Sequence, residues 1–159
     1  ENDIYIKTFE ALGASPTAMS FAEVFTALQQ GTVDGQDNPS NITNTSKFYE
    51  VQKYFTDLYH CIDLAPVMVS DEWYQSLPTD LRETFDAVVA ETIDYQRTLS
   101  QESEAADLEV ISTTCEITHL TEEQRQVFKD TCQPVYDWFA TQYPDLDLQT
   151  YMDEASKAA

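Results

Sequence analysis

The chain opens with apolar residues at helical spacing. Tyr5, Phe9 and Leu12 fall on one side of a helix of 3.6 residues per turn. Gly13 follows, and glycine commonly ends a helix at this position because it adopts a left-handed conformation without strain. The pattern therefore predicts a first helix over 4–12.

A second helix is predicted after a short extended stretch. Pro16 disfavours helix in the residue before it, so the chain should be extended there. Ser20 and Glu23 have the spacing of a capping box, in which each side chain bonds to the other residue's backbone N–H. The helix that they begin should stop at Gly31. Gly31 and Gly35 then bracket a turn or a short strand.

The middle of the chain alternates between predicted helix and predicted strand. We expect a helix over about 40–51 and strand character over 54–70. Asp71 should cap a short helical turn that holds Trp73 and Tyr74. This order is typical of a mixed α/β chain.

A long helix is the clearest single prediction. Pro78 suits its first turn, and the apolar stripe at 81, 85, 88 and 89 keeps helical spacing. Neither Gly nor Pro interrupts residues 79–133, so the helix should continue past Leu99 to about Ser112. The alternating residues 115–120 then predict a short strand.

The last part of the chain reads as helical. Thr121 and Gln124 form a second capping box and predict a helix through Phe139, with a kink at Pro134. A weaker helix is expected over 147–158. With short early elements and long late helices, residues 1–159 indicate one α/β or α+β domain.

Composition excludes several classes of function. The 159 residues are 42% hydrophobic, which suffices for a folded domain. No apolar run is long enough to span a membrane, and the first residues do not have the charged-then-apolar pattern of a signal peptide. The net charge of −21, from 29 acidic and 8 basic residues, excludes binding to nucleic-acid phosphates. The same charge disfavours an acidic membrane surface and otherwise suits a soluble protein.

The sequence contains no catalytic motif and no cofactor signature. We interpret His60 and His119 as structural, because neither has a second ligand at helical spacing. The residues from Asp34 to Asn38 loosely match a calcium loop, but the Glu of its twelfth position is absent. Cys115 could pair with a second cysteine, Cys132, in an exported protein, or the cysteines are small buried apolar residues.

Two blocks of sequence nevertheless resemble one family. The first runs from Gly13 to Pro39 and reads GASPTAMSFAEVFTALQQGTVDGQDNP. The second is KFYEVQKY, from Lys47 to Tyr54, followed by His60. Trp73 and the Leu-Pro pair at 77–78 fit the next segment, and the late helices fit in length and order. Together these features resemble the solute-receptor subunits of TRAP transporters over most of the chain.

The resemblance implies an α/β fold, the C-terminal lobe of a two-lobed periplasmic binding protein-like fold with long late helices and its N-terminal lobe missing. Such a protein is no enzyme and needs no cofactor. It captures a small organic acid, such as a dicarboxylate or a sugar acid, and delivers it to TRAP membrane subunits driven by an ion gradient. It works outside the cytoplasmic membrane, in a periplasm or on a lipid anchor.

The resemblance also implies two ligand-binding residues, Asn38 and Phe21. The Asn38 amide can pair with a carboxylate without adding a repelling charge. Phe21 begins a helix, so its ring should lie beside the N–H groups of the first turn, which favour an anion. Alternatively, Asn38 caps the next helix and Phe21 belongs to the core. Asp37 stands where the family commonly has Glu.

The family's carboxylate-clamping arginine is expected just upstream of Glu1. We therefore expect the chain alone to bind its ligand weakly or not at all, and its exposed apolar surface to drive a homodimer or a domain-swapped assembly. The alternative function is an acidic structural or interaction domain without ligand binding. The ligand's identity does not follow from the sequence.

Overall fold

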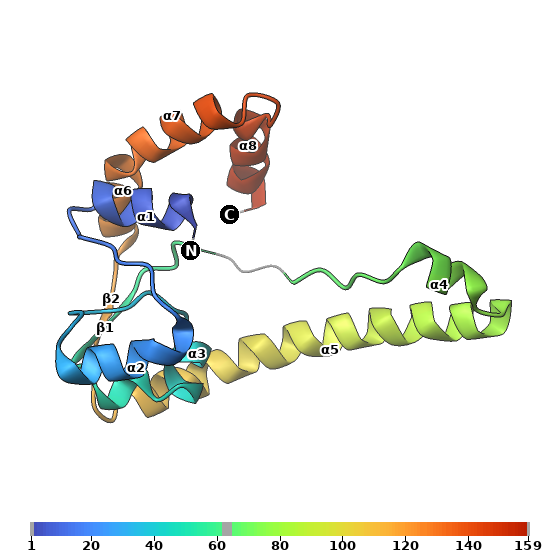
Figure 1. Cartoon of the computed structure of the whole chain (residues 1–159), viewed down its shortest axis with the longest axis horizontal. Helices are drawn as coiled ribbons and strands as arrows, with labels where there is room; N and C mark the ends of the chain where they lie inside the picture. The colour runs from blue at the N-terminus through green and yellow to red at the C-terminus, as the bar shows by residue number, and fades with distance from the viewer. Residues whose placement is uncertain (1, 62–64, 159) are drawn as a thin grey trace. The chain divides into compact units, whose positions relative to one another are not determined.

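The computed structural model describes residues 2–61 and 65–158, which divide into two compact units (Figure 1). The first unit joins both ends of the chain, Glu1–Val24 and His119–Ala159. The second is Phe25–Thr118. The division after Val24 falls within a helix, α2 (Phe21–Gln30).

The first unit is helical. Its elements are α1 (Asp3–Ala11), α6 (Glu122–Thr131), α7 (Gln133–Gln142) and α8 (Leu148–Ala158). α1 packs against α7. There the Lys7 ammonium lies 4.9 Å from the ring centroid of Trp138, a cation–π contact, and Val135 is buried nearby on α7. Segments from opposite ends of the chain thus share one small core.

Local signals set the helix ends in this unit. Asn2 caps α1 by accepting a hydrogen bond from the Ile4 N–H, and Gly13 takes the predicted left-handed conformation with φ +86°. The capping box of Thr121 and Gln124 is present in both directions. The predicted end of α1 before Gly13 and the predicted start of α6 are confirmed.

The single helix predicted through Phe139 was wrong. The helix is interrupted at Cys132, so that α6 ends at Thr131 and α7 begins at Gln133. Pro134 has no N–H, and its ring would clash with the carbonyl four residues earlier. In the first turn of a new helix the same residue removes no hydrogen bond. A break therefore costs less than the expected kink.

The second unit contains the sheet and the longest helix. After α2 come α3 (Ser40–Thr45), the 3-10 turn η1 (Phe48–Glu50), β1 (Tyr54–Asp57), α4 (Asp71–Ser76), α5 (Thr79–Ile111) and β2 (Glu116–His119). β1 and β2 pair into a two-stranded sheet. The long helix α5 confirms the prediction from Pro78 to about Ser112.

Two predictions for the middle of the chain were too long. The helix expected over 40–51 ends at Thr45, because Lys47 turns left-handed at φ +58°. The strand expected over 54–70 ends at Asp57, shortly before Tyr59, which has φ +51°. Residues 62–64 of that prediction lie outside the described residues.

The first half of α5 carries α4 along its side (Figure 1). The Trp73 and Phe85 rings meet edge to face at 5.5 Å between centroids, and the Tyr74 hydroxyl donates to the Asp86 carboxylate at 2.7 Å. The cap of α4 is Ser70, whose hydroxyl accepts from the Trp73 N–H. The predicted cap at Asp71 was therefore one residue late.

The core of the second unit lies where α3 and η1 meet the end of α5. Phe48 and Ile111 are fully buried, at 1% and 0% exposure, and Cys115 is also buried, at 6%. Thr43, on α3, is equally buried at 1%. A polar residue within this core must form hydrogen bonds, because an unpaired buried hydroxyl is costly.

One hydrogen bond ties α3 directly to α5. The Asn44 side-chain amide donates to the Asp107 carboxylate at 2.7 Å, and Asp107 is 8% exposed. A buried carboxylate requires a hydrogen-bond donor. An amide that loses its acceptor inside the protein destabilises the fold, because water does not fully replace the lost bond. The bond links residues 63 positions apart.

We predict that Asp107→Ala lowers the free energy of unfolding of the second unit by about 1–3 kcal/mol, because it leaves the Asn44 amide without this acceptor. Urea unfolding followed by far-UV circular dichroism measures the change. The control is Glu109→Ala on the same helix, where the side chain is exposed and the change should stay within about 0.5 kcal/mol. Equal midpoints for the two variants would contradict the role given to this bond.

Candidate functional site

Asn38 closes the loop between α2 and α3. Gly31 ends α2 with φ +69°, and the chain bends over residues 31–34. It then continues without regular structure to Pro39, and α3 begins at the next residue. The fixed φ of Pro39 restricts the backbone that carries Asn38. Asn38 itself is half-buried.

A chain of hydrogen bonds holds the Asn38 amide. Its Nδ2 donates to Gln36 Oε1 at 2.6 Å. Gln36 Nε2 in turn donates to Thr43 Oγ1 and to Gln52 Oε1, both at 3.3 Å. The Thr43 hydroxyl lies 3.5 Å from the backbone carbonyl of Asn38, which closes the circuit. The Gln36 amide thus connects the loop, helix α3 and the segment before β1.

His60 lies against the same loop. Its Nε2 is 3.1 Å from Asp37 Oδ1, and each side chain is 29% exposed. The hydrogen bond to Asp37 raises the pKa of His60 above 6.5; burial opposes the shift and the charge of Asp37 adds to it. Our interpretation of His60 as purely structural missed this pair. No spacing rule signals it, since the fold alone brings residues 37 and 60 together.

Phe21 occupies the first position of α2 and is 55% exposed, so it is not ordinary core. It belongs to the first unit and Asn38 to the second. The expected helix start is confirmed, because α2 begins directly after Ser20. The role of Phe21 in binding remains a prediction.

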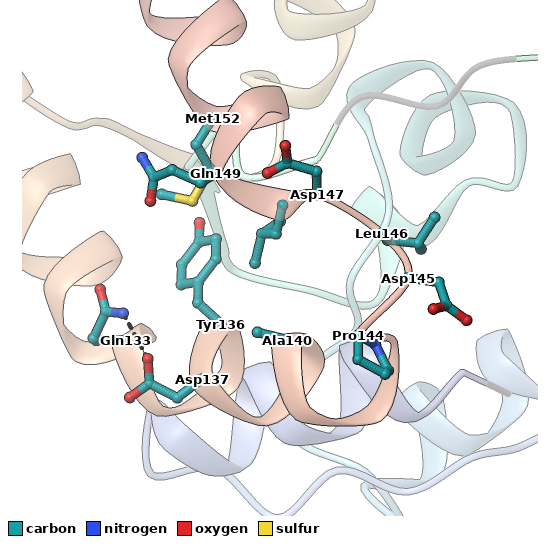
Figure 2. Close-up of a pocket in the computed structure, with 11 residues that line it drawn as sticks. Gln133, Tyr136, Asp137, Ala140, Pro144, Asp145, Leu146, Asp147, Gln149 and Met152 are labelled. Atoms are coloured by element: carbon teal, nitrogen blue, oxygen red, sulfur yellow. Dashed lines mark hydrogen bonds between the residues drawn. The ribbon is translucent and has the colours of Figure 1, made fainter.

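A groove lies elsewhere, between α7 and α8 (Figure 2). It encloses about 560 Å³ and is lined by Tyr136, Met152 and three carboxylates, those of Asp137, Asp145 and Asp147. Hydrogen bonds from Thr150 hold the pKa of Asp147 below its usual value, so this carboxylate stays charged. No lysine or arginine lines the groove. Its charge therefore opposes an organic acid.

The cysteines and carboxylates of the described residues build no metal site. Cys115 and Cys132 form no disulfide with each other. The Cys115 Sγ instead donates to the backbone carbonyls of Tyr49 and Gln52, at 3.6 and 3.4 Å. Cys115 is therefore a buried residue of the core, one of the two roles expected for it.

Comparison with known proteins identifies the family. The family described as bacterial extracellular solute-binding proteins, family 7, matches residues 1–142. That span includes Phe21, Asn38 and His60 and all but the last helix. The chain belongs to family 7 of the extracellular solute-binding proteins. Its members bind solutes for transport and are not a class of enzymes, and the resemblance to TRAP solute receptors is confirmed.

Curated family 7 relatives cover the chain almost fully. The C4-dicarboxylate-binding periplasmic protein DctP of Vibrio cholerae is 33% identical over 159 residues, which are 99% of this chain and 46% of that protein. Its namesake from Rhodobacter capsulatus is 36% identical over 132 residues, 82% of this chain and 40% of that protein. The chain thus spans about half the length of the relatives it matches.

Solved family 7 structures share its fold. A TRAP periplasmic solute binding protein from Ochrobactrum anthropi matches with a TM-score of 0.81 and 29% identity over 100% of this chain and 51% of its own. One from Shewanella oneidensis with bound succinate matches with a TM-score of 0.73 and 32% identity, over 89% of this chain and 47% of its own. The predicted α/β lobe of a periplasmic binding protein-like fold is confirmed. Among the described residues, no helix has both the length and the apolar character to cross a membrane.

We predict that Asp37→Asn lowers the pKa of His60, because the variant removes the acceptor and the charge that raise it. A pKa raised by folding stabilises the protein fully below pH 6.5, and this contribution disappears as the pH rises through the folded-state pKa. An NMR titration of the imidazole protons measures the pKa, and His119→Gln assigns the two histidine signals.

The matched control for this titration is Asp34→Asn, which removes an exposed carboxylate from the same loop. It should change the pKa of His60 much less than Asp37→Asn does. Equal pKa values in Asp37→Asn and in the unsubstituted chain would show that the Asp37–His60 pair does not form in solution.

Proposed function

We propose that the chain is the C-terminal part of a TRAP transporter solute receptor that captures a small organic acid. The observation that carries the proposal is the family match over residues 1–142. Similar proteins support the ligand class. One from Shewanella oneidensis holds succinate, and one from Sulfitobacter, 25% identical, holds β-D-galacturonate. Both ligands carry a carboxylate, and they span the dicarboxylate and sugar-acid classes.

Asn38 is the first residue that we propose to contact the ligand. An asparagine can donate to a carboxylate oxygen and accept from a hydroxyl without carrying charge. That neutrality matters in a chain of net charge −21, where a further carboxylate would repel an anion. The hydrogen bond from Asn38 to Gln36 fixes the amide before any ligand arrives, which lowers the entropy cost of binding.

Phe21 is the second residue that we propose to contact the ligand. Its ring is 55% exposed at the first position of α2. The free N–H groups of a helix's first turn favour an anion, and an aromatic ring beside them adds apolar contact. The pairing of ring and helix start supports the role.

The charge that balances the ligand must come from beyond this loop. Residues 31–46 contain no lysine, arginine or histidine. We propose that a longer protein supplies an arginine upstream, because arginine binds a carboxylate through two parallel hydrogen bonds. The intact mass of the native protein, expected to be about twice that of this chain, tests this step.

We further propose that the receptor catalyses no reaction and delivers its ligand to ion-gradient-driven membrane subunits. It would work outside the cytoplasmic membrane, in the periplasm or on a lipid anchor. Similar proteins from Rhodobacter capsulatus and Vibrio cholerae are named periplasmic binding proteins, which supports this placement.

We predict that a thermal-shift screen of organic acids on the native full-length protein finds a stabilising ligand, because a ligand that binds the folded state raises its melting temperature. With that ligand, calorimetry on Asn38→Ala should show binding about 10- to 100-fold weaker, the loss of a hydrogen bond to a charged group. Asn41→Ala, an exposed asparagine three residues on, is the control and should bind normally.

Stabilisation by no organic acid would contradict the proposed function and favour an acidic structural or interaction domain. Equal affinities of the Asn38→Ala and Asn41→Ala variants would instead leave the receptor function standing and remove Asn38 from the site. The chain alone should bind the same ligand weakly or not at all, since it contributes part of the site.

We predict that the chain alone forms a homodimer or a domain-swapped assembly, because its second unit exposes large apolar side chains. Met68 is 82% exposed, Tyr95 67% and Val67 61%. Multi-angle light scattering coupled to size-exclusion chromatography measures the mass at high protein concentration. The native full-length protein is the comparison and should be monomeric if its further residues cover this surface. A monomeric mass for the chain alone would contradict the prediction.

A further inference from the structure

Gln36 holds a central place in the second unit that the sequence comparison does not explain. Its side chain is half-buried and bonds to three others, those of Asn38, Thr43 and Gln52. Two of these partners come from outside the loop, from α3 and from the segment before β1. A glutamine bonded on both sides of its amide cannot rotate without losing several bonds at once.

The direction of these hydrogen bonds follows from the group at the end of the chain of bonds. The backbone carbonyl of Asn38 can accept and cannot donate, so the Thr43 hydroxyl donates to it. That hydroxyl oxygen therefore accepts from Gln36 Nε2. The carbonyl end of Gln36 is then left facing Asn38, and Asn38 must present Nδ2 to it, as the 2.6 Å bond shows.

We propose that Gln36 is a positioning residue that fixes which way the Asn38 amide faces, an inference that rests on the proposed function. With one Nδ2 hydrogen committed to Gln36, Asn38 keeps its second N–H and its Oδ1 for a ligand. A carboxylate or carbonyl oxygen of an organic acid can accept from that N–H. A hydroxyl on the same acid can donate to Oδ1.

The burial of Thr43 gives this arrangement a fixed base. At 1% exposure, Thr43 has no water to replace its partners. Its neighbour Asn44 is tied to Asp107 on α5. The core thus supports the orientation of Asn38 through Thr43 and Gln36.

The first arm of the test needs no ligand and uses this chain. The side-chain NH₂ group of Asn38 gives two proton signals in a ¹H–¹⁵N NMR spectrum, assigned with Asn38→Asp. The proton bonded to Gln36 should lie downfield and exchange slowly. Gln36→Leu should remove both properties, and Thr43→Val, of nearly the same shape, should weaken them. Thr43→Ser, which restores the hydroxyl, should recover them.

The second arm measures affinity in the native full-length protein, with succinate as the probe. If the freed Asn38 amide holds the binding orientation about a tenth of the time, the apparent affinity falls about tenfold. We expect this loss for Gln36→Leu and Thr43→Val and recovery in Thr43→Ser. The control Thr45→Val alters an exposed threonine of the same helix, whose hydroxyl bonds to a backbone carbonyl, and should bind normally.

The outcomes separate this inference from the function on which it rests. Failure of the unsubstituted protein to bind succinate or any other organic acid overturns the proposed function and the inference with it. Normal binding by Gln36→Leu, or unchanged Asn38 signals in that variant, overturns the inference alone. A fall in melting temperature with unchanged affinity shows that Gln36 acts in stability and likewise overturns it.

Discussion

The packing of α3 against the last third of α5 is the constraint on which the second unit depends. It buries Phe48, Ile111 and Thr43 almost completely and sets Asn44 on the carboxylate of Asp107. Without it the loop that carries Asn38 would have no fixed support, since that loop contains no regular structure of its own. The core therefore determines the geometry of the candidate site through α3.

This arrangement explains how a short loop can be ready for a ligand. Glycine at the end of α2 allows the left-handed turn, and proline before α3 restricts the backbone. The hydrogen bonds of Gln36 restrict the Asn38 side chain. Ordering that is complete before binding costs no affinity when the ligand arrives. Residues 31–46 contain no cation. In the proposed site this loop therefore orients the ligand, and another part of the protein must balance the ligand's charge.

The sequence predicted the elements whose signals are local. The reach of α5, the capping box at Thr121 and the end of α1 at Gly13 all depend on residues within one or two turns. It failed where long-range packing decides. No nearby residue predicts the left-handed conformation of Lys47, which follows the end of α3. No nearby residue predicts the pairing of His60 with Asp37. The family resemblance identified Asn38 and Phe21 as candidates, but the hydrogen bonds that orient Asn38 required the fold.

The most direct test of the account is a crystal structure of the native full-length protein with a bound organic acid. The account predicts an oxygen of that ligand about 3 Å from the Asn38 amide, with Nδ2 of Asn38 still donating to Gln36. It also predicts an arginine from outside this chain on the ligand's carboxylate. A ligand bound away from Asn38, or an Asn38 amide turned away from Gln36, would contradict it.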